Sequence, residues 1–407
     1  MKILVVTQYY FPEDFRINDI CEELVKRGHC VTVLTGLPNY PTGNIFEGYK
    51  DAYKRIEMHN GVTIIRVNNK PRKSGIFNLL RNYLSFYKKA SKAIDSLGNQ
   101  FDVVYGYQLS PVMSMKPAIK YKKKYNKPFY MYVCDIWPES IRDRGTGKPL
   151  SQKNPLFLYA KSISKKIYRQ ADMIGTKCPE FIDYLVDNCG VDRNKCHVNY
   201  EHAESNYLNV QETPIDNGVI DFMFAGNIGK SSNCDLIVKA ASKLKGNFKI
   251  HFIGDGSELN SIKTLVTDLK LNDKVLFHGR HPQNEMLDFY NKADVCLLTL
   301  SNTTAIGLTP PAKLSGYMAA SRPIIAAIDG SAKTIIENAQ CGFVSSSSDI
   351  ESFIQCLQMV IDDVNLLNRL GENGRNYFNK NFTLEKHLDV LEKTLTNIYK
   401  NYENLHN

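Results

Sequence analysis

Short apolar runs alternate with longer amphipathic stretches along the first half of the chain. Residues 2–7 form a continuous run rich in β-branched side chains, which predicts a strand buried on both faces. Residues 17–27 repeat apolar side chains every three or four positions, which predicts an amphipathic helix that stops at Gly28. The same criteria predict strands at 31–35, 62–67, 102–105, 129–133 and 173–176, and helices at 76–94 and 156–169.

The second half repeats this alternation. It predicts strands at 221–224, 249–253, 275–278, 295–300 and 323–327, and helices at 235–244, 258–269, 285–292, 312–320 and 333–338, followed by tail helices. The polar, turn-rich segment 206–218 separates the two halves. We therefore predict an α/β protein of two Rossmann-like, doubly wound domains facing across a cleft, a kind of crevice that binds ligands at the carboxyl ends of parallel strands.

The composition is that of a globular protein, with 43% hydrophobic and 23% charged residues among 407. The net charge of +9 suits anionic partners such as nucleotide phosphates, nucleic acid or an acidic membrane, and does not choose among them. The ten cysteines form no CxxC pair, so we interpret them as reduced, mostly buried thiols of a cytosolic protein rather than metal ligands.

Apolar stretches are too short for a membrane-spanning helix, which needs roughly 20 residues, and the N-terminal run is too short for a signal peptide. We therefore expect a soluble or peripheral protein. Segment 70–89 mixes basic and aromatic residues, and the basic run 122–124 adds to it. Its two interpretations are a surface that rests on an anionic bilayer near a lipid-linked acceptor, and an ordinary amphipathic core helix.

The loop after the predicted strand at 221–224 is the first candidate for chemistry. Gly226 and Gly229 let the backbone approach a ligand closely, and Lys230 adds a positive charge for a diphosphate. The alternative is an ordinary strand-to-helix turn. By contrast, the first strand of the chain runs into the glycine-free residues 8–16, and the sequence has no Walker A motif. This argues against a dehydrogenase and a P-loop ATPase.

A second candidate precedes the predicted helix at 312–320. Pro310 and Pro311 stiffen this loop, and Thr309 with the first-turn amides offers an anion site at the start of the helix. Lys313 lies on that first turn, where a cation is unfavourable unless an anion is near. The alternative is a solvated lysine.

Three charged residues of the first half follow predicted strands. Asp135 comes just after the strand at 129–133, at the end of the strand where sites lie; it is either a site residue or a cap of the next turn. Glu139, one turn later, either serves the site or bonds to the loop backbone. Arg16, on the glycine-free loop, is either a site residue or part of a surface or domain-bridging ion pair.

Together these segments resemble the retaining glycosyltransferases of the large family 4 group, with the GT-B architecture. The segments that carry the resemblance are 8–19, 27–29, 34–43, 135–140, 224–229 and 317–326. The first, third and fourth of these resemble the subgroup that transfers fucose or N-acetylfucosamine in bacterial O-antigen and capsule synthesis.

The resemblance implies an acceptor-binding domain at 1–205, a nucleotide-sugar-binding domain at 206–382, and a C-terminal helix at 383–407 that packs back on the first domain. It implies donor contacts from Gly226, Asn227, Gly229, Lys230, Gly279, Arg280, Thr309 and Lys313. It places Asp135, Glu139 and Arg16 in catalysis, and Glu13 and Asn18 on the acceptor side.

The chain departs from the family at the acidic pair that many members place around the donor sugar. Gly316 stands where the second glutamate belongs, and no glutamate occurs between Glu285 and Glu337. The arginine and lysine usual in the phosphate loop correspond to Asn227 and Ser232. The subgroup commonly lacks the second glutamate too, so we expect an active enzyme.

The resemblance implies a hexosyl or N-acetylhexosaminyl transferase that uses a UDP-sugar, such as an N-acetylated deoxyhexose donor. The expected acceptor is a lipid-linked or other glycan in surface polysaccharide synthesis. We expect no metal, no other cofactor and no nucleic-acid partner, and a cytoplasmic location at the inner face of the plasma membrane. The alternatives are a nucleotide-sugar epimerase and a non-catalytic partner subunit that binds a nucleotide sugar.

Overall fold

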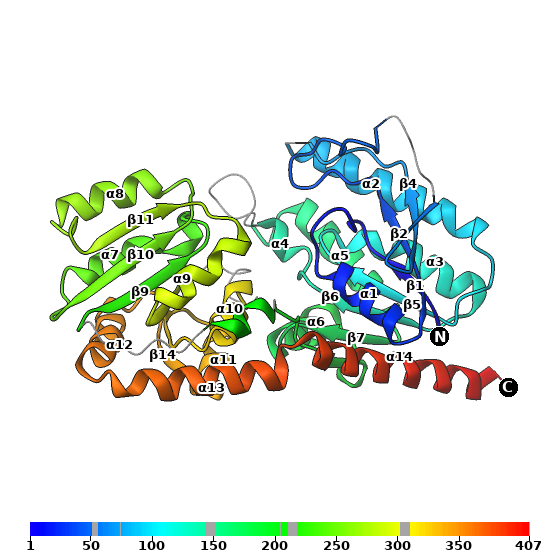
Figure 1. Ribbon diagram of the computed structural model, residues 1–407. Helices are drawn as coiled ribbons and strands as arrows, with labels where there is room; N and C mark the ends of the chain where they lie inside the picture. The colour runs from blue at the N-terminus through cyan, green and yellow to red at the C-terminus, as the bar shows by residue number, and fades with distance from the viewer. Residues whose placement is uncertain are drawn as a thin grey trace. The chain divides into compact units, whose positions relative to one another are not determined.

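The computed structural model describes residues 1–50, 56–73, 75–142, 151–203, 205–210, 218–301 and 310–406. The chain divides into two compact units (Figure 1). Unit 1 comprises Met1–Tyr200 with His387–Asn407, and unit 2 comprises Glu201–Lys386. Figure 1 shows helices on both faces of each sheet. The predicted pair of Rossmann-like α/β domains is therefore confirmed.

Among its described residues, unit 1 forms an eight-stranded sheet in the order β3-β4-β2-β1-β5-β6-β7-β8. Only β3 is antiparallel to its neighbour. The strands are β1 Lys2–Val6, β2 Cys30–Gly36, β3 Ile56–His59, β4 Val62–Val67, β5 Val103–Gln108, β6 Phe129–Val133, β7 Met173–Thr176 and β8 Cys196–Val198. The helices are α1 Ile17–Lys26, α2 Ile76–Ala93, α3 Lys116–Tyr125, α4 Glu139–Arg142, α5 Pro155–Tyr168, α6 Pro179–Cys189 and α14 Leu384–His406, with short 3₁₀ turns η1 Ile94–Ser96, η2 Val112–Met115 and η3 Arg193–Lys195.

The described part of unit 2 forms a six-stranded parallel sheet in the order β11-β10-β9-β12-β13-β14. The strands are β9 Ile220–Ala225, β10 Phe248–Ile253, β11 Val275–Gly279, β12 Val295–Thr299, β13 Ile324–Ala327 and β14 Gly342–Ser345. The helices are α7 Cys234–Ala241, α8 Leu259–Asp268, α9 Met286–Lys292, α10 Ala312–Ala319, α11 Ser331–Ala339, α12 Ile350–Asp362 and α13 Asn365–Asn381, with 3₁₀ turns η4 Ser205–Asn209, η5 Lys230–Ser232 and η6 Gln283–Glu285.

Both sheets have a point where the strand order reverses. In unit 1 it lies between β1 and β5, and in unit 2 it lies between β9 and β12. The connections leave these neighbouring strands in opposite directions, which opens a crevice at their carboxyl ends, and ligands of doubly wound folds bind there. The two switch points therefore mark the parts of each unit where a site is expected.

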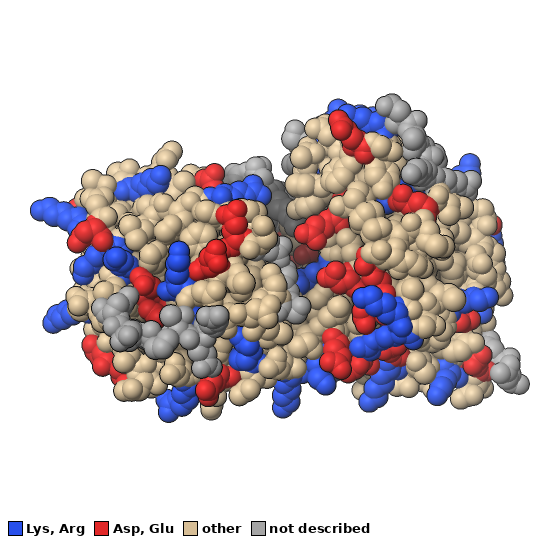
Figure 2. Space-filling model, in the orientation of Figure 1, with Lys and Arg blue, Asp and Glu red and all other residues tan. Residues whose placement is uncertain are grey.

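The C-terminal helix α14 belongs to unit 1 through both apolar and charged contacts. Leu388, Leu391 and Leu395 are completely buried. Arg27 Nη1 lies 3.0 Å from an Asp389 carboxylate oxygen. His29 Nε2 lies 2.7 Å from Glu392 Oε1, and the same ring contacts the amino terminus through Nδ1 at 3.2 Å. In Figure 2, acidic and basic side chains lie side by side over both units on the face shown.

Candidate functional site

The loops that follow β9 and β10 meet backbone to backbone next to the switch point of unit 2, on the β10 side of β9. The amide of Gly226 donates to the Ile253 carbonyl at 2.9 Å, and the amide of Gly254 donates to the Gly279 carbonyl at 2.7 Å. A Cβ atom at Gly254 would lie 1.9 Å from the carbonyl oxygen of Gly226, and both glycines have positive φ, +139° and +146°. Only glycine fits this contact, which joins the carboxyl ends of β9, β10 and β11.

The next residues continue this contact and turn the chain toward α7. The Ile228 amide donates to the Asp255 carbonyl at 2.9 Å, and a Cβ at Gly256 would lie 2.3 Å from the Ile228 carbonyl oxygen. Gly229 is buried, whereas Gly226, Asn227 and Lys230 are exposed. The loop after β10 therefore holds the predicted phosphate loop on one side, and the other side of the phosphate loop is exposed to solvent.

Lys313 enters this site from the first turn of α10. Its ammonium lies 3.9 Å from the centroid of the Phe224 ring and 3.4 Å from the position that a Cβ at Gly226 would take. Among the residues that the structure describes, no carboxylate pairs with it. Burial lowers the pKa of Lys313 to about 8, while the neighbouring thiols of Cys234 and Cys296 act in the opposite direction. Lys313 is thus a part-buried cation that has no counterion among the described residues, beside the exposed glycine loop.

Tyr317, one helical turn after Lys313, was not identified from the sequence. Its side chain is completely buried, and its hydroxyl oxygen lies 3.3 Å from the Ala225 amide nitrogen and 3.4 Å from the Leu297 carbonyl oxygen. The hydroxyl accepts from the first and donates to the second. Tyr317 therefore ties α10, and with it Lys313, to the ends of β9 and β12. Its place at the start of segment 317–326 did not indicate this structural role.

The position that departs from the family pattern, Gly316, faces two tyrosines. A Cβ there would lie 3.4 Å from both the Tyr207 ring and the Tyr290 hydroxyl. These two rings pack 4.7 Å apart and are almost entirely buried. A Cβ at position 316 would therefore make ordinary van der Waals contact with this pair, and the two rings border the space that a longer side chain would enter.

The remaining donor-side predictions lie at the edges of this site or outside the described residues. Gly279 ends β11 with φ +76°, and Arg280 follows it on the surface. Arg280 and Lys230 make no ion pair within the described parts of the chain. Thr309 lies outside the described residues, which resume at 310.

In unit 1, Asp135 and Glu139 follow the carboxyl end of β6 in different surroundings. Asp135 is half-buried, and its carboxylate has no hydrogen bond or ion pair among the described residues. Glu139 is 5% exposed and accepts a hydrogen bond of 3.1 Å from the Tyr184 hydroxyl. Burial, with the Glu139 charge acting in the same direction, raises the pKa of Tyr184 far above its ordinary value. Asp135 therefore has the carboxylate that a ligand can reach.

The predicted acceptor-side residues Glu13 and Asn18 hold the shape of their own loop. Glu13 is 3% exposed, and Oε1 accepts from the amides of Asn39 at 2.8 Å and Tyr40 at 2.7 Å. Asn18 donates to the Glu13 carbonyl at 2.8 Å and accepts from the Phe11 amide at 3.1 Å. Glu13 thus joins the loop after β1 to the loop after β2. Its carboxylate already accepts hydrogen bonds from backbone amides.

Arg16 is half-buried and occupies the N-cap position of α1. The fully buried cation of this region is another arginine, Arg66 in β4, which sequence reasoning missed. Its guanidinium contacts the Glu57 carboxylate, donates to the Gly36 carbonyl at 3.2 Å and to the Phe11 carbonyl at 2.5 Å. Arg66 therefore reinforces the connection that Glu13 makes between the first two loops.

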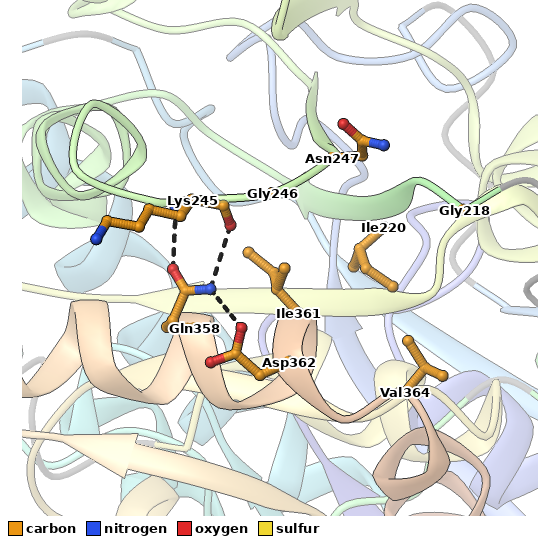
Figure 3. Close-up of a pocket in the computed structure, with 9 residues that line it drawn as sticks. All are labelled: Gly218, Ile220, Lys245, Gly246, Asn247, Gln358, Ile361, Asp362 and Val364. Carbon is orange, nitrogen blue, oxygen red and sulfur yellow. Dashed lines mark hydrogen bonds between the residues drawn. The ribbon is translucent and has the colours of Figure 1, made fainter.

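A cavity of about 370 Å³ lies elsewhere in unit 2, near the amino ends of β9 and β10 (Figure 3). Its Gln358 amide already bonds to the Lys245 backbone and to Asp362. The side chains that the sequence predicts for the donor do not line it. The structure instead brings Gly226, Gly279 and Lys313 around one pair of loops at the carboxyl ends of the strands.

Two family models match consecutive parts of the chain. The model of glycosyltransferase family 4 matches residues 16–201, and that of glycosyl transferases group 1 matches residues 208–377. An uncharacterised glycosyltransferase of Methanocaldococcus jannaschii is 24% identical over 392 residues, 95% of each chain. The UDP-Gal:alpha-D-GlcNAc-diphosphoundecaprenol alpha-1,3-galactosyltransferase of Escherichia coli is 29% identical over 141 residues, 34% of each chain.

Solved structures show the same fold at low sequence identity. The crystal structure of Anabaena Alr3699/HepE in complex with UDP superposes with a TM-score of 0.72 at 14% identity, covering 98% of this chain and all of the other. A glycosyltransferase from Rickettsia africae superposes with a TM-score of 0.69 at 17% identity, covering 98% and 99%. The fold is that of the GT-B glycosyltransferases.

Gly254→Ala should destabilise unit 2 strongly, because the new Cβ collides with the Gly226 carbonyl oxygen. Gly218→Ala is the matched control: Gly218 also has positive φ, +65°, but a Cβ there meets nothing within 4 Å. The control should lose only the roughly 1–2 kcal/mol of a left-handed residue. Hydrogen exchange of β9 and β10 peptides measures the difference, and equal protection in the two variants would contradict the steric account.

Glu13→Gln should change how stability depends on pH. Burial raises the pKa of Glu13 to about 7 from 4.5, against the opposing backbone amides. A carboxyl with a raised folded-state pKa contributes stability that is complete below pH 4.5 and is lost as the pH rises to about 7. Urea unfolding followed by the fluorescence of Trp137, the single tryptophan, measures unit 1. The variant should lack this decline; a difference from wild type that is constant across pH would refute the assignment.

Proposed function

We propose that this chain, a GT-B glycosyltransferase of the group 1 and family 4 type, transfers a sugar from a UDP-sugar to a lipid-linked glycan with retention of the anomeric configuration. The observation that carries the proposal is the Lys313 ammonium, which has no ion-pair partner among the described residues and lies beside the exposed face of Gly226. A buried cation without a counterion is costly, and a bound diphosphate would supply the missing charge.

The chemistry that this site supports is electrostatic. The acceptor hydroxyl oxygen bonds to C1 of the donor sugar, the bond from C1 to the diphosphate oxygen breaks, and the leaving diphosphate takes the hydroxyl proton. The negative charge grows on the diphosphate, so a preorganised ammonium and backbone amides stabilise the transition state more than the ground state. Lys313 and the Gly226–Lys230 loop provide such groups, and no metal enters this scheme.

Asp135 is the side chain of unit 1 that we expect to act on the reacting sugar. Its carboxylate is half-buried and unpaired among the described residues, whereas those of Glu13 and Glu139 are already hydrogen-bonded. For the sugar, the resemblance of segments 8–19, 34–43 and 135–140 to transferases of fucose and N-acetylfucosamine supports a proposal but does not fix the donor. An N-acetylated deoxyhexose is therefore the donor that we propose to test first.

The choice of UDP and of a lipid-linked acceptor draws on similar proteins. A GT-B structure that superposes over the whole chain contains UDP. The name of the Escherichia coli relative gives UDP-galactose as its donor and a GlcNAc carried on diphosphoundecaprenol as its acceptor. Both features agree with a donor site built for a diphosphate, and we propose a role in surface polysaccharide synthesis.

The surface of α2 suits an acceptor held at a membrane. The helix carries Arg81, Lys88, Lys89 and Lys92 and no acidic residue, and its outer side chains Phe77 and Leu80 are 72% and 44% exposed. Its inner face is fixed because the buried Asn82 accepts from Gln8 at 2.6 Å. The described residues contain no helix that is long and apolar enough to span a bilayer. We propose that α2 rests on anionic lipid.

Lys313→Met should weaken UDP binding by about 10-fold or more, the loss expected for a charge-assisted bond. Lys333→Met is the control, because Lys333 is an exposed lysine of α11 at 3.9 Å from Glu337. Calorimetric titration with UDP, followed by turnover with UDP-sugars and a lipid-linked acceptor, measures both steps. Failure of the wild-type protein to bind UDP, GDP and dTDP would reject the donor site; binding without turnover would favour a non-catalytic partner subunit.

The double variant Phe77→Ser, Leu80→Ser should lose binding to vesicles that contain anionic lipid, because it removes the exposed apolar contacts of α2. Met359→Ser, which alters a 45% exposed apolar residue of α12, should bind like wild type. Co-sedimentation with anionic and with neutral vesicles measures this. If the double variant sediments as well as wild type, α2 is not the membrane contact.

A further inference from the structure

Two buried glutamines at the switch point of unit 1 have unused acceptor oxygens. Gln8 follows β1 and Gln108 ends the neighbouring β5, and their side chains are 2% and 0% exposed. Their amide groups donate, that of Gln8 to Asn82 Oδ1 at 2.6 Å and that of Gln108 to the Leu109 carbonyl at 2.9 Å. Neither Oε1 atom has a hydrogen-bond partner among the described residues. Both oxygens are enclosed by protein, so the part-exposed side chains around Gln8 are the groups that a ligand contacts directly.

An aromatic wall stands next to Gln8. The Tyr9 hydroxyl accepts from Gln8 Nε2 at 3.3 Å, and its ring stacks on that of Phe15 at 5.4 Å. The Tyr40 ring is tilted against both, at 5.6 Å from Tyr9 and 5.3 Å from Phe15. Tyr9 is buried, whereas Phe15 is part-exposed and Tyr40 is 38% exposed. The outer members of this cluster thus present ring surface to a ligand.

A cation completes the cluster. The Arg72 guanidinium lies 5.4 Å from the centroid of the Tyr40 ring. It has no carboxylate partner in the part of the chain that the structure describes. The Arg72 amide donates to Asn39 Oδ1 at 2.7 Å, and the amide of Asn39 is held in turn by Glu13 at 2.8 Å. The two connected loops therefore fix the backbone beside both the cation and the aromatic wall.

We propose that this cluster is the acceptor subsite and that it takes a saccharide bearing a phosphate or diphosphate. The apolar face of the sugar ring packs on Phe15 and Tyr40, and the phosphate pairs with Arg72. The proposal rests on the glycosyltransferase function above and adds that the acceptor is recognised through its anionic linkage. Helix α2 begins four residues after Arg72. The surface that we propose to contact lipid therefore follows the subsite directly along the chain.

Calorimetric titration of the full-length protein tests this with three probes: N-acetylglucosaminyl diphosphate carrying a short alkyl chain, N-acetylglucosamine 1-phosphate, and free N-acetylglucosamine. The phosphate-bearing probes should bind wild type more than about 10-fold tighter than the free sugar, as a charge-assisted bond predicts. Arg72→Gln should remove that preference, and Tyr40→Ala should weaken the binding of all three probes. A diphosphate probe that binds no tighter than the monophosphate would assign the site to one phosphate.

Arg369→Gln and Tyr159→Ala, which alter exposed residues of α13 and α5, serve as matched controls and should bind like wild type. The affinity for UDP should stay within about twofold in every variant, which shows that unit 2 is intact, and urea unfolding followed by Trp137 fluorescence shows that unit 1 folds. Loss of UDP binding in wild type would reject the proposed donor site. Intact UDP binding with probe affinities that are unchanged in Arg72→Gln and Tyr40→Ala, or with no probe binding at all, would overturn the acceptor subsite alone.

Discussion

The contact between Gly226 and Gly254 is the constraint on which the donor side of this protein depends. No side chain fits where the two loops meet, and the bonds from Gly226 to Ile253 and from Gly254 to Gly279 fix three strand ends in one arrangement. That arrangement leaves one face of the loop open. Lys313 lies near this face because Tyr317 anchors its helix to β9 and to the neighbouring β12. Backbone packing, rather than a set of acidic side chains, thus shapes the site.

Both units place their candidate residues at the carboxyl ends of parallel strands, but these residues suit different chemistry. In each, the site lies where the strand order reverses, at the carboxyl ends of neighbouring strands. Unit 2 presents backbone amides and a desolvated ammonium, which suit a diphosphate. Unit 1 presents aromatic rings and, at Asp135, a carboxylate without a partner among the described residues, which suit hydroxyl-rich molecules. This division follows from side chains, because the sheets themselves are alike.

The sequence was most informative where local pattern decides structure. Strands β4, β6 and β7 have the predicted bounds, since continuous β-branched or aromatic runs leave little choice. Helix α3, with five lysines among ten residues, and the short β14 were not predicted because their apolar patterns are weak. Gly226 and Lys313 stood out as candidates by their residue type and place. The roles of Glu13 and Tyr317 could not be foreseen, since their partners lie 26 and 92 residues away.

The central claim is that Lys313 is the counter-charge of the donor diphosphate. Its pKa of about 8 leaves it partly neutral in the free protein at pH 8, and a bound diphosphate would raise that pKa and draw a proton from solution. Calorimetry of UDP binding at pH 8, in buffers of different ionisation enthalpy, measures this proton directly. We predict net proton uptake by wild type and none by Lys313→Met. Binding without uptake, or with equal uptake in the variant, would contradict the account.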